Sequence, residues 1–156
     1  QLVPARAGLS GRLGSATWTA LWPRQDDPVY PTGNDASVVV EMHGGGVPRT
    51  LFLGDLSAAP QRQLVRDGRI AGPYDIVKVA HHGSADQDAG LYDLVHARVA
   101  LIGVGADNDY GHPRAETVAL LEAGGAQVER TDDRGRILIG IRDGELVLWG
   151  ERMAGD

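Results

Sequence analysis

The sequence contains no cysteine, a single phenylalanine, and a single lysine among its 15 basic residues. Without cysteine the chain forms no disulfide bond or thiolate-zinc site, and it has no cysteine nucleophile. It also lacks an apolar run long enough to cross a membrane and a recognisable secretory signal. The net charge of −6 argues against broad electrostatic binding to nucleic acid or to an anionic membrane surface. It does not exclude a nuclease, because bound metal ions supply local positive charge.

The 156 residues are 42% hydrophobic and 23% charged, which is the composition of a globular domain or of a piece of one. Valine, isoleucine and leucine are frequent enough to build a core. We treat residues 1–156 as a single, partial domain whose segment 1–16 is poorly defined. The chain begins with Gln1 rather than methionine, which we interpret as the mark of a fragment.

Helices and strands alternate through the middle of the predicted structure, and hairpins lie at both ends. We expect strands at 17–22, 37–43, 50–53, 75–80, 99–104, 127–131, 136–142 and 145–149. Helices are expected from Ser57 to Gly68, from Asp88 to Ala97 and from Arg114 to Ala123, with Pro113 in the first turn of the last one. Turns are expected at 44–46, 132–135 and 143–144. The pattern predicts an α/β sandwich with a mixed sheet and flanking helices.

Polar side chains follow three of these apolar strands. Asp55 follows the first, His81 and His82 follow the second, and the loop 108–113 with His112 follows the third. Parallel strands joined by one helix bring their ends to the same edge of a sheet, where α/β folds place binding groups. Asp and His are also the ligands of zinc or manganese hydrolases. Since consecutive strand residues point in opposite directions, one of the two adjacent histidines suffices as a ligand.

Each of these residues also has a structural interpretation. Asp55 precedes a helix and resembles an N-cap, and Ser84 can cap the next segment or bind a phosphate oxygen. His112 is a candidate general acid, phosphate ligand or N-cap neighbour at a helix N-terminus. Arg130 and Thr131 are typical of a charged hairpin turn, with phosphate contact as the alternative.

Four motifs, in this order, resemble the metallo-β-lactamase-like domain at the C-terminus of the ComEC family, the membrane channel proteins of bacterial DNA uptake. They are Phe-Leu-Gly-Asp at 52–55, Asp-Ile-Val-Lys-Val-Ala-His-His-Gly-Ser at 75–84, Asn-Asp-Tyr-Gly-His-Pro at 108–113, and Arg-Thr-Asp at 130–132 followed by Gly135. The similarity extends from about Asn34 to Trp149. It implies that the chain is the second half of an αββα sandwich with a two-metal site at one sheet edge.

The resemblance also implies phosphodiester hydrolysis by a hydroxide held between two zinc or manganese ions. We assign Asp55 and His81 as metal ligands, with either adjacent histidine able to match the family's ligand. His82 and His112 are assigned as catalytic residues. Substrate-binding roles are assigned to Ser84, Asn108, Tyr110, Arg130 and Thr131.

The family's first ligand motif, His-x-His-x-Asp-His, is absent from this sequence. We therefore expect the isolated chain to bind metal weakly and to show little nuclease activity. The longer parent protein is expected to degrade single-stranded DNA. An alternative is a non-catalytic module that guides DNA or packs against the membrane channel, and another is a small-molecule phosphodiesterase. The family implies the extracytoplasmic face of the bacterial membrane. A half-sandwich would expose apolar sheet surface, and a homodimer of the fragment would bury it.

Overall fold

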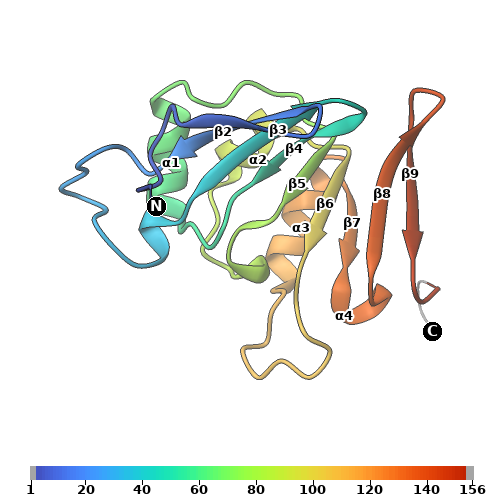
Figure 1. The fold of residues 1–156 in the computed structure, drawn as a ribbon. Helices are drawn as coiled ribbons and strands as arrows, with labels where there is room; N and C mark the ends of the chain where they lie inside the picture. The colour runs from blue at the N-terminus through green and yellow to red at the C-terminus, as the bar shows by residue number, and fades with distance from the viewer. Residues whose placement is uncertain (1–2, 154–156) are drawn as a thin grey trace.

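The computed structural model describes residues 3–153, and its main feature is a seven-stranded sheet in the order β1 to β7 (Figure 1). The first three pairings are antiparallel and the last three are parallel, so the predicted mixed sheet is confirmed. The segment predicted to be poorly defined contributes the edge strand β1. The strands are β1 (Ser10–Leu13), β2 (Ala16–Trp22), β3 (Val39–Gly44), β4 (Val47–Phe52), β5 (Ile76–Lys78), β6 (Val99–Ile102) and β7 (Gln127–Arg130).

Three helices connect the parallel strands. They are α1 (Ala58–Arg66), α2 (Ala89–Val95) and α3 (Ala115–Ala123). Because β4, β5, β6 and β7 are neighbours in chain order, crossovers of one hand place all three helices on the same face of the sheet. Figure 1 shows them behind the strands.

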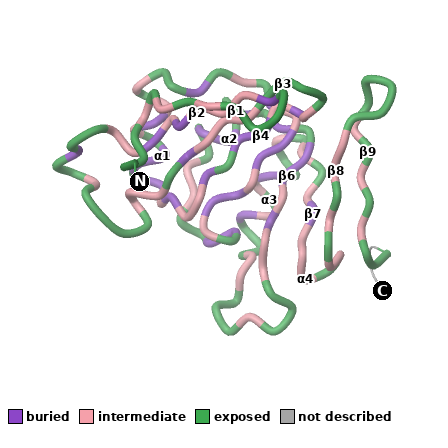
Figure 2. The backbone as a smooth tube through the Cα atoms, viewed as in Figure 1, coloured by how far each residue is buried: buried purple, intermediate pink, exposed green. Residues whose placement is uncertain are grey.

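The core lies between this helical layer and the sheet. Leu51, Val77 and Ala100 occupy neighbouring register positions on β4, β5 and β6, and all three are buried. Leu64 of α1 and Leu91 of α2 are fully buried in the same cluster. Figure 2 shows the buried backbone concentrated in these central strands. Burying each leucine side chain contributes about 1.5–3 kcal/mol, which anchors the strands that end at the site.

The last two strands form a separate hairpin, β8 (Ile137–Arg142) and β9 (Glu145–Gly150). The turn residues Asp143 and Gly144 both have positive φ, 54° and 83°, as a two-residue hairpin loop requires. The predicted turn at 132–135 is wrong for most of its length, because α4 (Thr131–Arg134) is helical there. Its acidic residues Asp132 and Asp133 lie in the first turn, where they favour helix formation.

Several boundaries differ by one to a few residues from the sequence prediction, and two of the differences bear on the site. Pro113 lies outside the third helix, which begins at Ala115 because Arg114 has an extended backbone (φ −73°, ψ 141°). The strand expected at 75–80 ends at Lys78 and is followed by the short 3-10 helix η2 (Ala80–Gly83). No helix within residues 3–153 is long and apolar enough to span a bilayer.

Asp27 holds the loop that connects β2 to the 3-10 helix η1 (Asn34–Ala36). Its side chain is almost fully buried and accepts hydrogen bonds from Arg24 Nε (2.7 Å), Val29 N (2.9 Å) and Tyr30 N (3.3 Å). The hydrogen bond from Arg24 is the largest cause of a lowered pKa for Asp27. A lowered pKa means that the folded state favours the carboxylate. The carboxylate therefore stabilises the fold fully at pH values above the usual pKa of 3.8, and this stabilisation is lost as the pH falls through the lowered pKa.

Asp27→Asn is expected to lower the free energy of unfolding by about 1–2 kcal/mol at pH 7. The difference from the unmodified chain should shrink as the pH falls through the lowered pKa of Asp27, because both chains are then neutral at this position. Urea unfolding at pH 7 and at pH 3 measures it. An equal difference at both values would show that the charge of Asp27 contributes nothing.

Candidate functional site

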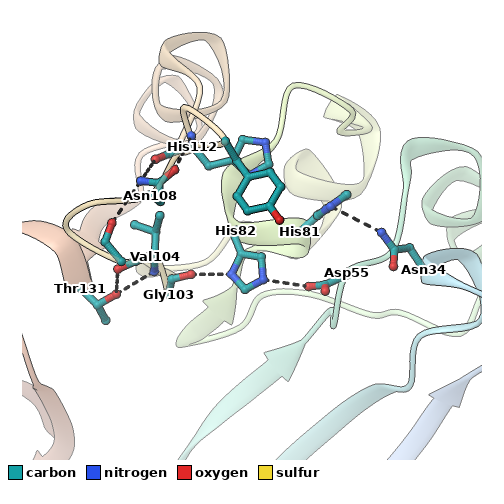
Figure 3. Close-up of a pocket in the computed structure, with 11 residues that line it drawn as sticks. Asn34, Asp55, His81, His82, Gly103, Val104, Asn108, His112 and Thr131 are labelled. Carbon is teal, nitrogen blue, oxygen red and sulfur yellow. Dashed lines mark hydrogen bonds and ion pairs between the residues drawn. The ribbon is translucent and has the colours of Figure 1, made fainter.

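A pocket of about 690 Å³ opens at the edge of the sheet where β4, β5 and β6 end (Figure 3). It brings together residues from both chain halves, and most of the predicted site residues line it. These are Asp55, His81, His82, Asn108, Tyr110, His112 and Thr131. Ser84 and Arg130 do not line it, whereas Asn34, which was not among the assigned site residues, does.

The turn after β4 places Asp55 in the pocket. Gly54 has φ 58°, and a Cβ atom there would lie 2.8 Å from the Ser37 side chain. The backbone N–H of Asp55 then donates to Ser37 Oγ at 3.1 Å. A side chain at position 54 would be strained and crowded, so glycine is what allows the strand to end this way.

Asp55 lies between two nitrogen groups. Its Oδ1 atom is 3.6 Å from Lys78 Nζ and 3.6 Å from His82 Nε2. Lys78 also donates to the Gly54 carbonyl at 2.8 Å. Burial lowers the pKa of Lys78, and Asp55 opposes that shift. The carboxylate is therefore partly neutralised by the protein's own lysine.

The ring of His82 is fixed from its other side. His82 Nδ1 is 2.5 Å from the carbonyl oxygen of Gly103, which can only accept, so Nδ1 carries a proton (Figure 3). In the neutral ring the lone pair is then on Nε2, which faces Asp55. A divalent cation can bind both the imidazole lone pair and the carboxylate oxygen that faces it, as two of its ligands.

His81 faces a different part of the pocket. Its Nε2 is 3.4 Å from Asn34 Nδ2, and its ring centroid is 5.7 Å from that of His112. His81 was assigned as the ligand beside Asp55, with His82 as the alternative, and in the structure Asp55 contacts His82. Strand alternation does not apply here, because His81 and His82 are both left-handed, with φ of 46° and 53°. Such strain, about 1–3 kcal/mol for each residue, is typical of functional sites.

His112 lies in the same pocket as His81, as the strand order predicts. Asn108 holds its backbone, since Asn108 Nδ2 donates to the His112 carbonyl (2.9 Å) and His112 N donates to Asn108 Oδ1 (3.1 Å). Desolvation, followed by the charge of His81, lowers the pKa of His112 below 6.5. At pH 7 His112 is therefore a neutral imidazole that can accept a proton.

Three of the predicted substrate-binding residues make hydrogen bonds or ion pairs to other parts of the protein. Ser84 is buried, and its carbonyl accepts from Thr117 Oγ1 at 2.7 Å. Arg130 is paired with Asp132. Thr131 Oγ1 is 2.7 Å from both the N–H and the carbonyl of Val104, which joins α4 to the pocket wall. Substrate contact by these residues stays a prediction.

A partly buried polar network lies behind the two histidines. Gln87 Nε2 donates to the carbonyls of Ala80 and Ser84, both at 3.0 Å, and these residues bracket His81 and His82. Gln87 Oε1 accepts from Tyr92 Oη (2.7 Å) and from Gln61 Nε2 (3.0 Å). The sequence analysis missed this network because glutamine is not a typical catalytic residue. The position of Gln87, three residues after Ser84, was the available signal.

The donors in the pocket fit only part of a metal site. Asp55 and His82 converge, but the ammonium group of Lys78 contacts the same carboxylate oxygen. Among residues 3–153, no group of three or more histidine, aspartate or glutamate side chains is placed to hold a metal ion. A zinc site needs three or four protein ligands. The described residues alone therefore do not complete a metal centre.

The chain is similar to ComE operon protein 3 of Bacillus subtilis (strain 168). The two are 30% identical over 118 residues, which is 75% of this chain and 15% of that protein. This similarity supports the predicted relationship to the ComEC competence family. No family model and no solved structure matches the chain.

Proposed function

We propose that this chain is part of a metal-dependent phosphodiesterase domain that acts on DNA during competence DNA uptake. The observation that supports this best is the pocket in which Asp55 and three histidines meet at the ends of parallel strands. The similarity to a competence protein much longer than this chain agrees with it. The sheet with helices on one face is compatible with half of a metallo-β-lactamase-like sandwich.

The chain's own residues have distinct roles in this proposal. Asp55 and either His81 or His82 contribute ligands to a zinc or manganese centre. The remaining ligands come from residues outside these 156. Bound metal would supply a hydroxide nucleophile and neutralise phosphate charge. His112, which is neutral at pH 7, accepts or returns a proton next to His81. We place the domain at the extracytoplasmic face of the membrane as part of a channel protein.

A second candidate is a non-catalytic module that guides DNA or packs against the channel. The contact of Lys78 with Asp55 favours it, because a lysine that neutralises the carboxylate replaces the charge of a metal ion. A small-molecule phosphodiesterase is the third candidate, since the pocket alone does not define the size of the substrate.

The test compares these 156 residues with a longer natural chain that contains them. We expect the longer chain to bind zinc or manganese and to cleave single-stranded DNA in a chelator-sensitive reaction, and the 156 residues to bind metal weakly and cleave little. Asp55→Asn in the longer chain should reduce cleavage at least about tenfold, the lower end of the loss seen when metal-site partners are removed. Asp143→Asn, in the distant hairpin turn, is the matched control.

Each outcome separates the candidates. Tight metal binding with chelator-sensitive cleavage by the 156 residues alone would show that the site is complete without further ligands. DNA binding without cleavage by the longer chain would favour the guiding module. Cleavage of bis-p-nitrophenyl phosphate but not of DNA would favour the small-molecule enzyme.

A further inference from the structure

Tyr110 is an aromatic side chain that the pocket leaves in solvent. It lines the pocket and is 78% exposed, more than the other exposed large hydrophobic side chains of residues 3–153. Its ring centroid is 6.2 Å from that of His112, with the two planes inclined by 30°. A tyrosine ring in water at the mouth of a pocket is an available surface for stacking.

The loop around Tyr110 is held by its own hydrogen bonds. Arg114 NH2 donates to the Tyr110 carbonyl at 3.2 Å, and Asn108 Nδ2 donates to the carbonyls of Gly105 (3.1 Å) and His112 (2.9 Å). The backbone that presents the ring is therefore tied down on both sides of Tyr110. Because the backbone is already ordered, less entropy is lost when the ring stacks than would be lost from a mobile loop.

We propose that Tyr110 is a stacking platform for a nucleobase of single-stranded DNA that enters the pocket. This inference rests on the proposed function and adds how the strand is held. Base stacking on aromatic side chains is the usual way in which proteins hold single strands without reading their sequence. Bases inside a duplex are already stacked, so the platform selects single strands.

The charges around the ring indicate that the base, rather than the phosphate, dominates this contact. Arg114 supplies a guanidinium group next to Tyr110, but Asp107 and Asp109 lie on the same loop, and the chain has a net charge of −6. With about one phosphate contact, the logarithm of the affinity should fall against the logarithm of the salt concentration with a slope of only about −0.7. A protein that held the strand through its phosphates would show a much steeper slope.

The experiment measures binding of a fluorescein-labelled 12-mer of thymidylate by anisotropy, in EDTA so that metal-dependent cleavage is absent. The probes for comparison are a 12-mer of the same backbone without bases, a 12-base-pair duplex and thymidine monophosphate as competitor. Tyr110→Ala should weaken binding of the thymidylate 12-mer about 5- to 150-fold. It should leave the weaker binding of the abasic 12-mer unchanged. Tyr110→Phe, which keeps the ring, is the matched variant and should bind like the unmodified chain.

The proposal is overturned if Tyr110→Ala binds the thymidylate 12-mer as well as the unmodified chain does, or if it weakens the abasic 12-mer equally. If thymidine monophosphate competes with the same affinity as the 12-mer, the ligand is a mononucleotide and the proposal of a single-stranded DNA ligand is overturned. Because the assay contains no free metal, failure of stacking leaves the cleavage proposal intact. Conversely, a chain that cleaves nothing can still show base-dependent binding.

Discussion

Gln87→Leu is expected to lower the free energy of unfolding by about 2–4 kcal/mol. The substitution removes the donor to the Ala80 and Ser84 carbonyls and the acceptor for Tyr92 Oη and Gln61 Nε2. Gln61 is fully buried but keeps its hydrogen bond from Nε2 to the Leu56 carbonyl (2.7 Å), and the Ser84 carbonyl keeps Thr117 Oγ1, so the loss falls on the contacts of Gln87 with the Ala80 carbonyl and Tyr92 Oη. Each buried polar group left without a partner costs about 1–3 kcal/mol, and part of that cost is recovered by local rearrangement.

Urea unfolding measures this loss, and the NMR signals of His81 and His82 report whether their loop moves. Gln25→Leu, at an exposed position, is the matched control and should change stability by less than about 0.5 kcal/mol. If Gln87→Leu also stays within about 1 kcal/mol and leaves the histidine signals in place, the network does not hold the loop.

Gly83→Ala is expected to lower the free energy of unfolding by about 2–4 kcal/mol and to separate the two histidine loops. Gly83 has φ 78°, which costs an alanine about 1–2 kcal/mol. A Cβ atom there would lie 2.7 Å from Pro113 Cβ and 3.2 Å from Pro113 Cα. The Gly83 carbonyl also accepts a hydrogen bond from Arg114 N at 2.8 Å. The clash with Pro113 would therefore lengthen or break this hydrogen bond between the two loops.

The readout specific to the site is the nuclear Overhauser effect between the rings of His81 and His112, whose centroids are 5.7 Å apart. We expect it to weaken or vanish in Gly83→Ala. Gly105→Ala is the matched control in the same pocket, because a Cβ atom there meets nothing within 4 Å. An unchanged ring contact in Gly83→Ala would show that the loops tolerate the extra methyl group.

The sequence by itself determined the sheet and the edge at which the site lies. Apolar runs separated by helical segments predict parallel strands, and parallel strands bring their ends together. Asp55, His82 and His112 follow such strands, and all three line one pocket. Two hairpin turns were also predictable, since glycines at 44–46 and Asp143-Gly144 supply the positive φ values that the turns need, whereas the turn expected at 132–135 was not formed.

Only the tertiary structure decided which groups face one another inside that pocket. The contact of Asp55 with His82 depends on two consecutive left-handed residues, and their φ angles are set by the packing of the loop rather than by strand alternation. Asn34 and Gln87 reach the histidine loop from distant or unremarkable positions. Amide side chains have no periodicity that marks them in a sequence, because their role is defined by the backbone groups that folding brings within hydrogen-bonding distance.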